Sequence, residues 1–447
     1  MSANVFDASV APTYVATIAI PVATIDALVC RGAGHLLRNW HQPYDLFVPR
    51  GSSGIDEDVP LDSPRPRRGA ISGQQTRGIA SGRLIAVAYG SPVPESTADP
   101  TYLVEEYFAA YVRIDRAHPS SVTLVGHDED AVRHLARRVL HAVRALDNGQ
   151  RRRRKAPSQD IKDVRSTAGA SEYAAQVAHI RERILAGDLF QANLSRELTV
   201  EWPGATRADV AGFAERLLTQ TNAPFGAILH DGPNRTIVSA SPERFFRVER
   251  LGDGRLKVIA EPIKGTRPRH ADPVVDRAAA EELLGSEKDR AENVMIADLV
   301  RNDLSLVCED ESITVERLCE LRSFATVHHL VTTVTGILRP GRTALDALRA
   351  QFPCGSITGA PKLAAMDLIS ELEQRERGIY CGAIGYVAAD GSADFSVAIR
   401  TATVDYHAGG ATIRYGVGGG VTALSDPGEE YRETEDKAAD FLRALRP

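Results

Sequence analysis

Strand-like and helix-like segments occur in blocks along this chain, and this arrangement constrains the fold most. Apolar and polar residues alternate over several segments between 225 and 261 and again between 381 and 423, whereas helical spacing covers about 274–304 and 428–445. Strands in runs, separated by long helices, are typical of antiparallel sheets rather than of regular βαβ repeats. The sequence therefore predicts an α+β fold with largely antiparallel sheets.

A strand with a polar face follows the first clearly helical segment of this region. Ser171 is a candidate N-cap for a helix that ends near Gly187. In the next segment, LFQANLSREL, apolar residues alternate with Gln191, Asn193 and Ser195. Such a polar face can point to water or into a polar cavity, and the pattern alone leaves both possibilities open.

The composition is that of a globular protein without nucleic-acid partners. Hydrophobic residues make up 43% and charged residues 25% of the chain, and the formal net charge is −6, whereas proteins that follow a phosphate backbone are usually basic. The five cysteines form no CxxC pair, which argues against a disulfide framework and a zinc site. The apolar stretch 14–30 is interrupted by Pro21 and Asp26 and has no basic leader. We therefore expect a cytoplasmic protein without a membrane span.

The sequence divides into three predicted parts. Residues 1–150 form a divergent N-terminal region, 151–170 a linker, and 171–447 the catalytic domain. The linker contains the basic run Arg151–Lys155. A solvated linker is the simpler interpretation of this run, although RNA-binding segments can look alike.

Carboxylates lie at helical spacing in two places. Glu430, Glu433 and Lys437 share one face of the closing helix, and Asp289 and Glu292 share a face of an earlier one. Exposed ion pairs of this spacing are common. However, two helices that each offer two carboxylates can also build an oxygen-rich site for Mg²⁺.

Several other segments suit the binding of an anionic ligand. Glycines at 416–420 allow close approach of a ligand to the backbone, and 355–362 combines hydroxyl residues with a helix N-terminus. Arg400, in a predicted strand, would be costly to bury without an anion, and Tyr380 can supply a second donor. Lys264 is flanked by Pro262 and Gly265; a surface lysine in a turn is the simpler interpretation.

Nine motifs occur in the order found in one known enzyme family. They are SPERF (241–245), PIKGTRPR (262–269), KDRAENVMIADLVRNDL (288–304), VHHLVTT (327–333), FPCGSITGAPK (352–362), YCGAIGY (380–386), DFSVAIRT (394–401), YGVGGGVTALSDP (415–427) and EEYRETEDKA (429–438). Together they resemble the chorismate-utilising family, which includes anthranilate, isochorismate, salicylate and aminodeoxychorismate synthases. The resemblance covers about residues 171–445 and implies a large α/β sandwich with two central antiparallel sheets flanked by helices.

The resemblance also implies a role for each motif position. Four carboxylates are expected to hold Mg²⁺ directly or through water: Glu292, Glu433, Asp289 and Glu430. A second set is expected to hold the chorismate carboxylates and ring: Arg400, Tyr380, Lys437, Ser356 and the backbone of Gly418, Gly419 and Gly420. Glu243 is expected to be the general acid that helps the 4-hydroxyl leave. His329 is expected to line the ring pocket, where it can donate a hydrogen bond or transfer a proton.

Two positions separate the branches of the family. Isochorismate and salicylate synthases carry a lysine where Gln191 stands, and glutamine cannot activate water as a base. Anthranilate synthases typically carry alanine where Lys264 stands, whereas aminodeoxychorismate synthases carry lysine. Both positions favour amination of chorismate to 4-amino-4-deoxychorismate, with Gln191 in the substrate site and Lys264 as catalytic nucleophile.

The ammonia for this reaction is expected from a separate glutamine amidotransferase subunit, because the sequence contains no GxCxGxQ-type nucleophile turn. The alternatives are anthranilate synthase component I, opposed by Lys264, and a water-using isochorismate or salicylate synthase, opposed by Gln191. A catalytically inactive chorismate-binding subunit is opposed by the intact acid and carboxylate positions. Residues 1–100 lack the N-terminal features usual in the family, and Cys354 stands where glycine is usual.

Overall fold

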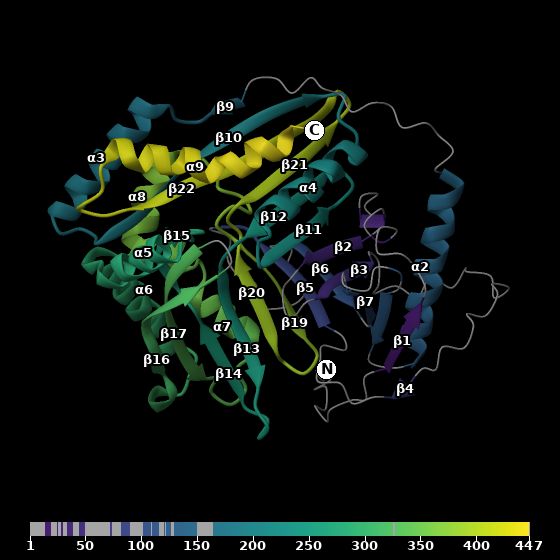
Figure 1. The fold of residues 1–447 in the computed structure, drawn as a ribbon. Helices are drawn as coiled ribbons and strands as arrows, with labels where there is room; N and C mark the ends of the chain where they lie inside the picture. Colours follow the sequence, from purple (N-terminus) through teal and green to yellow (C-terminus); the bar gives the residue numbers. More distant parts are fainter. Residues whose placement is uncertain are drawn as a thin grey trace.

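Two large sheets form the centre of the molecule (Figure 1). The computed structural model describes residues 14–18, 25, 28–29, 34–38, 44–49, 72–73, 82–89, 102–108, 110–115, 120, 122–126, 129–149, 164–324 and 327–446. Every strand pairing between these residues is antiparallel, in both sheets. The predicted α+β class is confirmed.

The first sheet contains thirteen strands within the described residues. In spatial order they are β18 (Gly359–Ala360), β10 (Gln191–Pro203), β22 (Gly410–Val421), β21 (Thr401–His407), β12 (Arg235–Ser241), β11 (Phe225–Asp231), β2 (Gly34–Arg38), β3 (Tyr44–Pro49), β7 (Ala110–Asp115), β8 (Val122–Gly126), β1 (Tyr14–Ile18) and β4 (Ser72–Gly73), with β9 (Val164–Ser166) paired to β10. The long pairing of β10 with β22 places the strand with the polar face next to the glycine-rich segment in the sheet.

The second sheet contains nine strands within the same described part of the chain. Their order is β15 (Ile263–Pro268), β17 (Val327–Ile337), β14 (Leu256–Ala260), β13 (Arg244–Arg250), β20 (Ala393–Val397), β19 (Ala383–Ala388), β5 (Gly82–Val87) and β6 (Tyr102–Phe108), with β16 (Thr314–Ser323) paired to β17. Both sheets include strands from the predicted N-terminal region, and β9 lies in the predicted linker. The division into domains stays a prediction.

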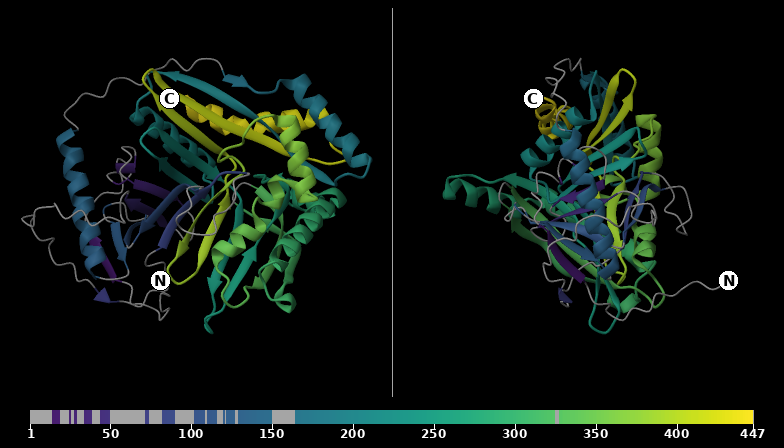
Figure 2. Two further views of the ribbon diagram at one scale, coloured as in Figure 1. Left: turned by 180° about the vertical axis from the view of Figure 1, so that it is seen from behind. Right: turned by 90° about the vertical axis from the view of Figure 1, so that its right-hand side faces the viewer.

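Helices pack along both sheets. They are α2 (Glu129–Gly149), α3 (Ala170–Leu185), α4 (Arg207–Thr221), α5 (Pro273–Gly285), α6 (Glu287–Ser305), α7 (Ala344–Gln351), α8 (Lys362–Glu373) and α9 (Pro427–Leu445). The views from the front and from behind show α9 lying along β22 and beside α3 (Figures 1 and 2). No helix among the described residues is long and apolar enough to cross a membrane.

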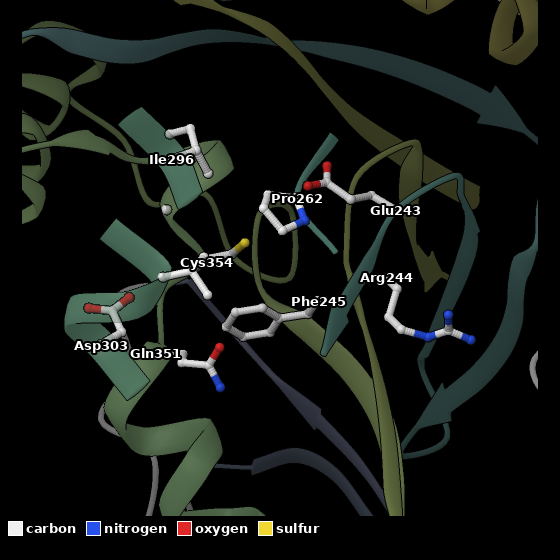
Figure 3. Close-up of a pocket in the computed structure, with 10 residues that line it drawn as sticks. Glu243, Arg244, Phe245, Pro262, Ile296, Asp303, Gln351 and Cys354 are labelled. Carbon is white, nitrogen blue, oxygen red and sulfur yellow. The ribbon is translucent and has the colours of Figure 1, made fainter. Parts of the chain in front are cut away.

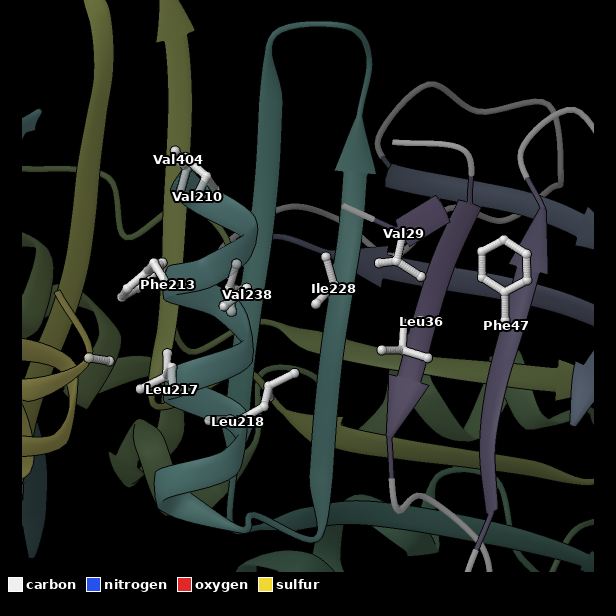
Figure 4. Packing of buried hydrophobic residues seen from close by; sticks show 14 of the residues in the cluster. Val29, Leu36, Phe47, Val210, Phe213, Leu217, Leu218, Ile228, Val238 and Val404 are labelled. Atoms are coloured by element: carbon white, nitrogen blue, oxygen red, sulfur yellow. The ribbon is translucent and has the colours of Figure 1, made fainter. Parts of the chain in front are cut away.

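The largest core cluster of the described residues packs α2, α4 and α9 against the first sheet. Val210, Phe213 and Leu217 project from α4 toward the strands (Figure 4). The Phe441 ring of α9 stacks on Tyr415 of β22 with centroids 4.2 Å apart and meets Phe213 edge-on. This packing holds α9, and therefore its carboxylates, at a defined height along β22.

Three local predictions need correction. The single helix predicted over 274–304 is two helices, because Ser286 adopts an extended conformation and its side chain accepts a hydrogen bond from the Asp289 backbone N–H at 3.2 Å. The helix predicted to start at Ser171 has Gly169 as its N-cap. Arg400 is not within a strand: with φ of 52° it lies between β20 and β21, where the chain passes from one sheet to the other.

Candidate active site

The glycine-rich end of β22 brings together two side chains from different sheets. Gln191 begins β10 in the first sheet, and Lys264 lies on β15 in the second. A Cβ atom at Gly420 would lie 2.8 Å from Gln191 Nε2 and 3.4 Å from Lys264 Nζ. Glycine is needed here because a side chain would occupy the space that these polar groups share.

Gln191 resolves the question that the alternating pattern left open. Its side chain is 0% exposed, and Asn193 and Ser195 are also buried. The polar strand face therefore points inward. Among the described residues, neither the oxygen nor the nitrogen of the Gln191 amide has a hydrogen-bond partner. Because a buried amide without partners is costly, this one is suited to a polar ligand or water.

The α9 carboxylates lie beside the next glycine. A Cβ atom at Gly419 would lie 2.9 Å from Glu430 Oε2 and 3.6 Å from Glu433 Oε1. Glu430 is buried, and its Oε2 has no partner within the described part of the chain. Lys437 forms an ion pair with Glu433 at 2.5 Å and donates to the Gly418 carbonyl at 2.8 Å.

The two predicted carboxylates of α6 are placed differently from each other. Burial raises the pKa of Glu292; the positive charges of Lys264 and Lys288 oppose this rise, whereas nearby Glu433 adds to it. Glu292 is therefore near enough to Glu433 of α9 for the two charges to interact. Asp289 instead accepts a hydrogen bond from Arg267 at 3.2 Å.

This set of residues suits Mg²⁺ in its chemistry. All the donors are carboxylate oxygens, which this ion prefers, and the buried Glu430 Oε2 has no hydrogen-bond partner among the residues that the structure describes. Burial also raises the pKa of Glu430, and the charge of Glu433 contributes to the rise. Within the described residues, however, no three His, Cys, Asp or Glu side chains already stand close enough to form a metal cluster.

Glu243 lies in the turn between β12 and β13, where its backbone is hydrogen-bonded on both sides. Its N–H donates to Ser241 Oγ at 3.2 Å, and its carbonyl accepts from the Val397 N–H at 3.1 Å. Burial raises the pKa of Glu243, and a hydrogen bond with Ser356 and the charges of two lysines, Lys264 and Lys437, oppose the rise without cancelling it. A carboxyl group with a raised pKa can keep its proton and act as an acid.

A pocket behind Glu243 brings that residue close to the loop of Ser356. Glu243, Phe245, Pro262 and Cys354 are among the residues that line it (Figure 3). Cys354 Sγ lies 3.3 Å from Ser356 Oγ. Burial raises the pKa of the Cys354 thiol to about 12, so the thiol stays protonated and does not compete as a nucleophile.

His329 lies on β17, beside the strand that carries Lys264. Its Nδ1 is 2.9 Å from the Thr266 hydroxyl oxygen. Burial lowers the pKa of His329, which favours the neutral ring. A neutral imidazole can line a ring pocket and still exchange a proton.

Tyr380 and Arg400 support the β22 and α9 backbone. A Cβ atom at Gly416 would lie 2.4 Å from the Tyr380 ring, and Tyr380 is buried. Arg400 Nη1 donates to the Lys437 carbonyl at 2.9 Å. The structure therefore brings these two predicted substrate contacts close to predicted site elements, where both residues contact other parts of the protein.

Three charged or polar residues at this site are absent from the prediction. Lys288 acts on the pKa of both Glu292 and Glu430, Ser425 hydrogen-bonds Glu430, and Arg267 pairs with Asp289. Lys288 could have been predicted from the sequence, because it lies four residues before Glu292 on the same helix.

Sequence comparison identifies relatives with several activities. The chain is 44% identical over 277 residues to "Anthranilate synthase component 1" of Streptomyces coelicolor, covering 62% of this chain and 52% of that protein. It is 42% identical over 276 residues to "Aminodeoxychorismate synthase component 1" of Salmonella typhimurium, covering 61% of this chain and 57% of that protein. It therefore spans only about half the length of these relatives.

Solved structures share the fold. Anthranilate synthase component I from Streptococcus pneumoniae aligns with a TM-score of 0.65 and 26% identity over 97% of this chain and 93% of that one. The menaquinone-specific isochorismate synthase from Escherichia coli aligns with a TM-score of 0.68 at 16% identity, over 97% and 95% of the two chains, and supports the fold alone. Residues 87–443 match the family described as chorismate binding enzyme. The chain belongs to this chorismate binding enzyme family.

Proposed function

We propose that this protein aminates chorismate with ammonia to form 4-amino-4-deoxychorismate, the precursor of 4-aminobenzoate. The observation that carries the proposal is that Lys264 Nζ and the Gln191 amide both lie beside Gly420. A lysine there can act as a nucleophile, and an amide cannot serve as the base that a water-using enzyme needs.

The reaction proceeds in two substitutions. Lys264 adds to ring carbon 2 while Glu243 protonates the 4-hydroxyl, which leaves as water. Ammonia then attacks carbon 4 and expels the lysine amine, so that chorismate and ammonia give 4-amino-4-deoxychorismate and water. The raised pKa of Glu243 supports its role as the acid. The enolpyruvyl group stays attached.

Residues on both helices would hold Mg²⁺. Glu292, Glu430 and Glu433 would be its carboxylate ligands, with Asp289 nearby once it is released from Arg267. The bound ion supplies positive charge for the ring carboxylate of chorismate. Lys437, now paired with Glu433, would then be available to the substrate.

The remaining predicted residues would orient the substrate. Ser356, the Gly418–Gly420 backbone, Tyr380 and Arg400 would hold the chorismate carboxylates. His329 would line the ring pocket in its neutral form. For the four side chains, the corresponding alanine variant tests the assignment, because it should raise the KM for chorismate if the residue binds substrate.

Ammonia would come from a separate glutamine amidotransferase subunit in the cytoplasm. The "component 1" name of the Salmonella typhimurium relative supports a multi-component enzyme. Purified alone, the chain should use ammonium at alkaline pH and ignore glutamine. Glutamine-dependent turnover by the isolated chain would contradict this part of the proposal.

Anthranilate formation is the second candidate, because the relative from Streptomyces coelicolor is about as similar as the aminodeoxychorismate synthase component 1 of Salmonella typhimurium. Incubation with chorismate, Mg²⁺ and ammonium salt separates the two, with the product identified by mass and by conversion with a 4-amino-4-deoxychorismate lyase. We expect 4-amino-4-deoxychorismate. Anthranilate, isochorismate or salicylate as the main product would contradict the proposal, and so would intact chorismate.

A further inference from the structure

A buried ion pair lies at the end of α8, between its last residue and Arg377, and neither residue is assigned to substrate or metal. Arg377 and Glu373 are both 1% exposed at the side chain. Their contact is two-pronged: Arg377 Nε donates to one Glu373 oxygen at 3.0 Å and Nη2 to the other at 2.6 Å. We call these two residues the clamp.

The arginine of the clamp also holds two backbone segments of the active site. Its Nη1 donates to the Ile357 carbonyl at 3.0 Å, and its Nη2 donates to the Asn193 carbonyl at 2.6 Å. The guanidinium carbon lies 4.6 Å from the centroid of the Tyr89 ring. One guanidinium group thus joins the loop of Ser356 to strand β10.

The glutamate of the clamp strengthens the grip on β10. Its Oε1 accepts hydrogen bonds from both the backbone N–H and the hydroxyl of Ser195, each at 2.8 Å. Arg375 donates to the same hydroxyl at 2.7 Å. Both charges of the clamp are therefore hydrogen-bonded, which is the condition under which buried charges are tolerated.

The two clamped segments carry residues of the proposed site. Ile357 directly follows Ser356, whose hydrogen bond acts on Glu243. Asn193 lies two residues after Gln191, on the same face of β10. A further hydrogen bond, from the Asn193 N–H to the Thr358 carbonyl at 2.8 Å, joins the segments directly.

Stability alone does not explain a buried ion pair, because apolar residues of similar volume often serve a core equally well. The segments to which the clamp is hydrogen-bonded offer an explanation. We propose that Arg377 and Glu373 are positioning residues that hold Ser356 against Glu243 and Gln191 against Lys264. The proposal rests on the proposed function, from which it takes chorismate as the substrate and the roles of these four site residues.

The test is a double-mutant cycle on chorismate consumption. Arg377→Lys keeps the charge and loses the two-pronged contact, and we expect kcat/KM to fall about tenfold or more. Ser356→Ala removes the hydrogen bond on Glu243 directly. If Arg377 acts partly through Ser356, the double variant should be far less impaired than the product of the two single effects predicts. The alkaline limb of the pH–rate profile should also move upward in both single variants.

Arg216→Lys is the matched control, since Arg216 donates to the Ala444 carbonyl at 2.8 Å and joins α4 to α9 away from the clamped segments. It should keep wild-type kcat/KM within about twofold. An Arg377→Lys variant with wild-type kinetics would overturn the proposal, as would two single effects that simply multiply.

Two further measurements test the proposal if Arg377→Lys does not fold or if no turnover can be measured. If Arg377→Lys does not fold, Glu373→Gln carries the same kinetic prediction, because it retains an acceptor for Ser195. Hydrogen exchange at the Asn193 amide needs no turnover: it should speed up in the clamp variant and not in the control, and equal rates would overturn the proposal. Because chorismate consumption is followed, a different wild-type product would contradict the proposed function and leave the clamp test intact.

Discussion

Replacing Gly420 with alanine probes the convergence of Gln191 and Lys264 directly. The new methyl group would lie 2.8 Å from Gln191 Nε2 and 3.4 Å from Lys264 Nζ. Gln191 is 0% exposed, so its amide can yield only by leaving its preferred rotamer, which costs about 0.5–1.5 kcal/mol. We expect the free energy of unfolding to fall by about 1 kcal/mol. Turnover should fall by about tenfold or more, equal to about 1.4 kcal/mol of barrier.

Two other glycines provide controls for this experiment. A Cβ atom at Gly252 meets no atom within 4 Å, so Gly252→Ala should change neither stability nor turnover. A Cβ atom at Gly418 would lie 2.3 Å from the Leu194 carbonyl oxygen, so Gly418→Ala should force β22 from β10 and mainly lower stability. Urea unfolding and initial rates with ammonium measure both quantities. Wild-type turnover in Gly420→Ala would refute the idea that the Gln191 amide and the Lys264 amine take part in the reaction beside Gly420.

Three further predictions concern metal, nucleophile and acid. Glu433→Gln should abolish nearly all turnover while the circular dichroism spectrum is retained; unchanged wild-type activity in EDTA would refute the Mg²⁺ site. Gln191→Lys should raise an isochorismate side product, detected by mass and retention time, and no increase in a variant that binds chorismate would show that this position does not select the nucleophile. A general acid loses activity as pH rises through its pKa, and the Ser356 hydrogen bond lowers the pKa of Glu243. Ser356→Ala should therefore shift the alkaline limb of the pH–rate profile to higher pH. An unchanged limb would show that Ser356 does not affect the pKa of Glu243.

Local patterns predicted much of the fold because they report burial along a single element. The alternation around Gln191 marks a strand, and the apolar spacing of α9 places Glu430 and Glu433 on the same helix. The break at Ser286 was missed because the helical pattern continues on both sides of it. A single residue that caps the following helix is enough to end the first one.

Local sequence patterns could not predict the contacts between elements that are distant in the chain. Nothing near Lys264 in the sequence indicates that its amine lies beside the same glycine as Gln191 of the other sheet, because the packing of one sheet on the other is set by tertiary contacts. Arg377 lies in the charged segment EQRERG, which is typical of a solvated helix end, yet its side chain is 1% exposed. The family resemblance, rather than periodicity, supplied the roles of Glu243 and Arg400.

Intact-protein mass spectrometry with chorismate and Mg²⁺, in the absence of ammonia, tests the central claim most directly. The lysine mechanism predicts a covalent adduct of chorismate minus water on the wild-type chain. The adduct should map to the peptide that contains Lys264, disappear when ammonium is added, and be absent from Lys264→Ala, whose turnover should fall by more than about tenfold. No adduct on the wild type, together with wild-type rate and product from Lys264→Ala, would contradict the mechanism.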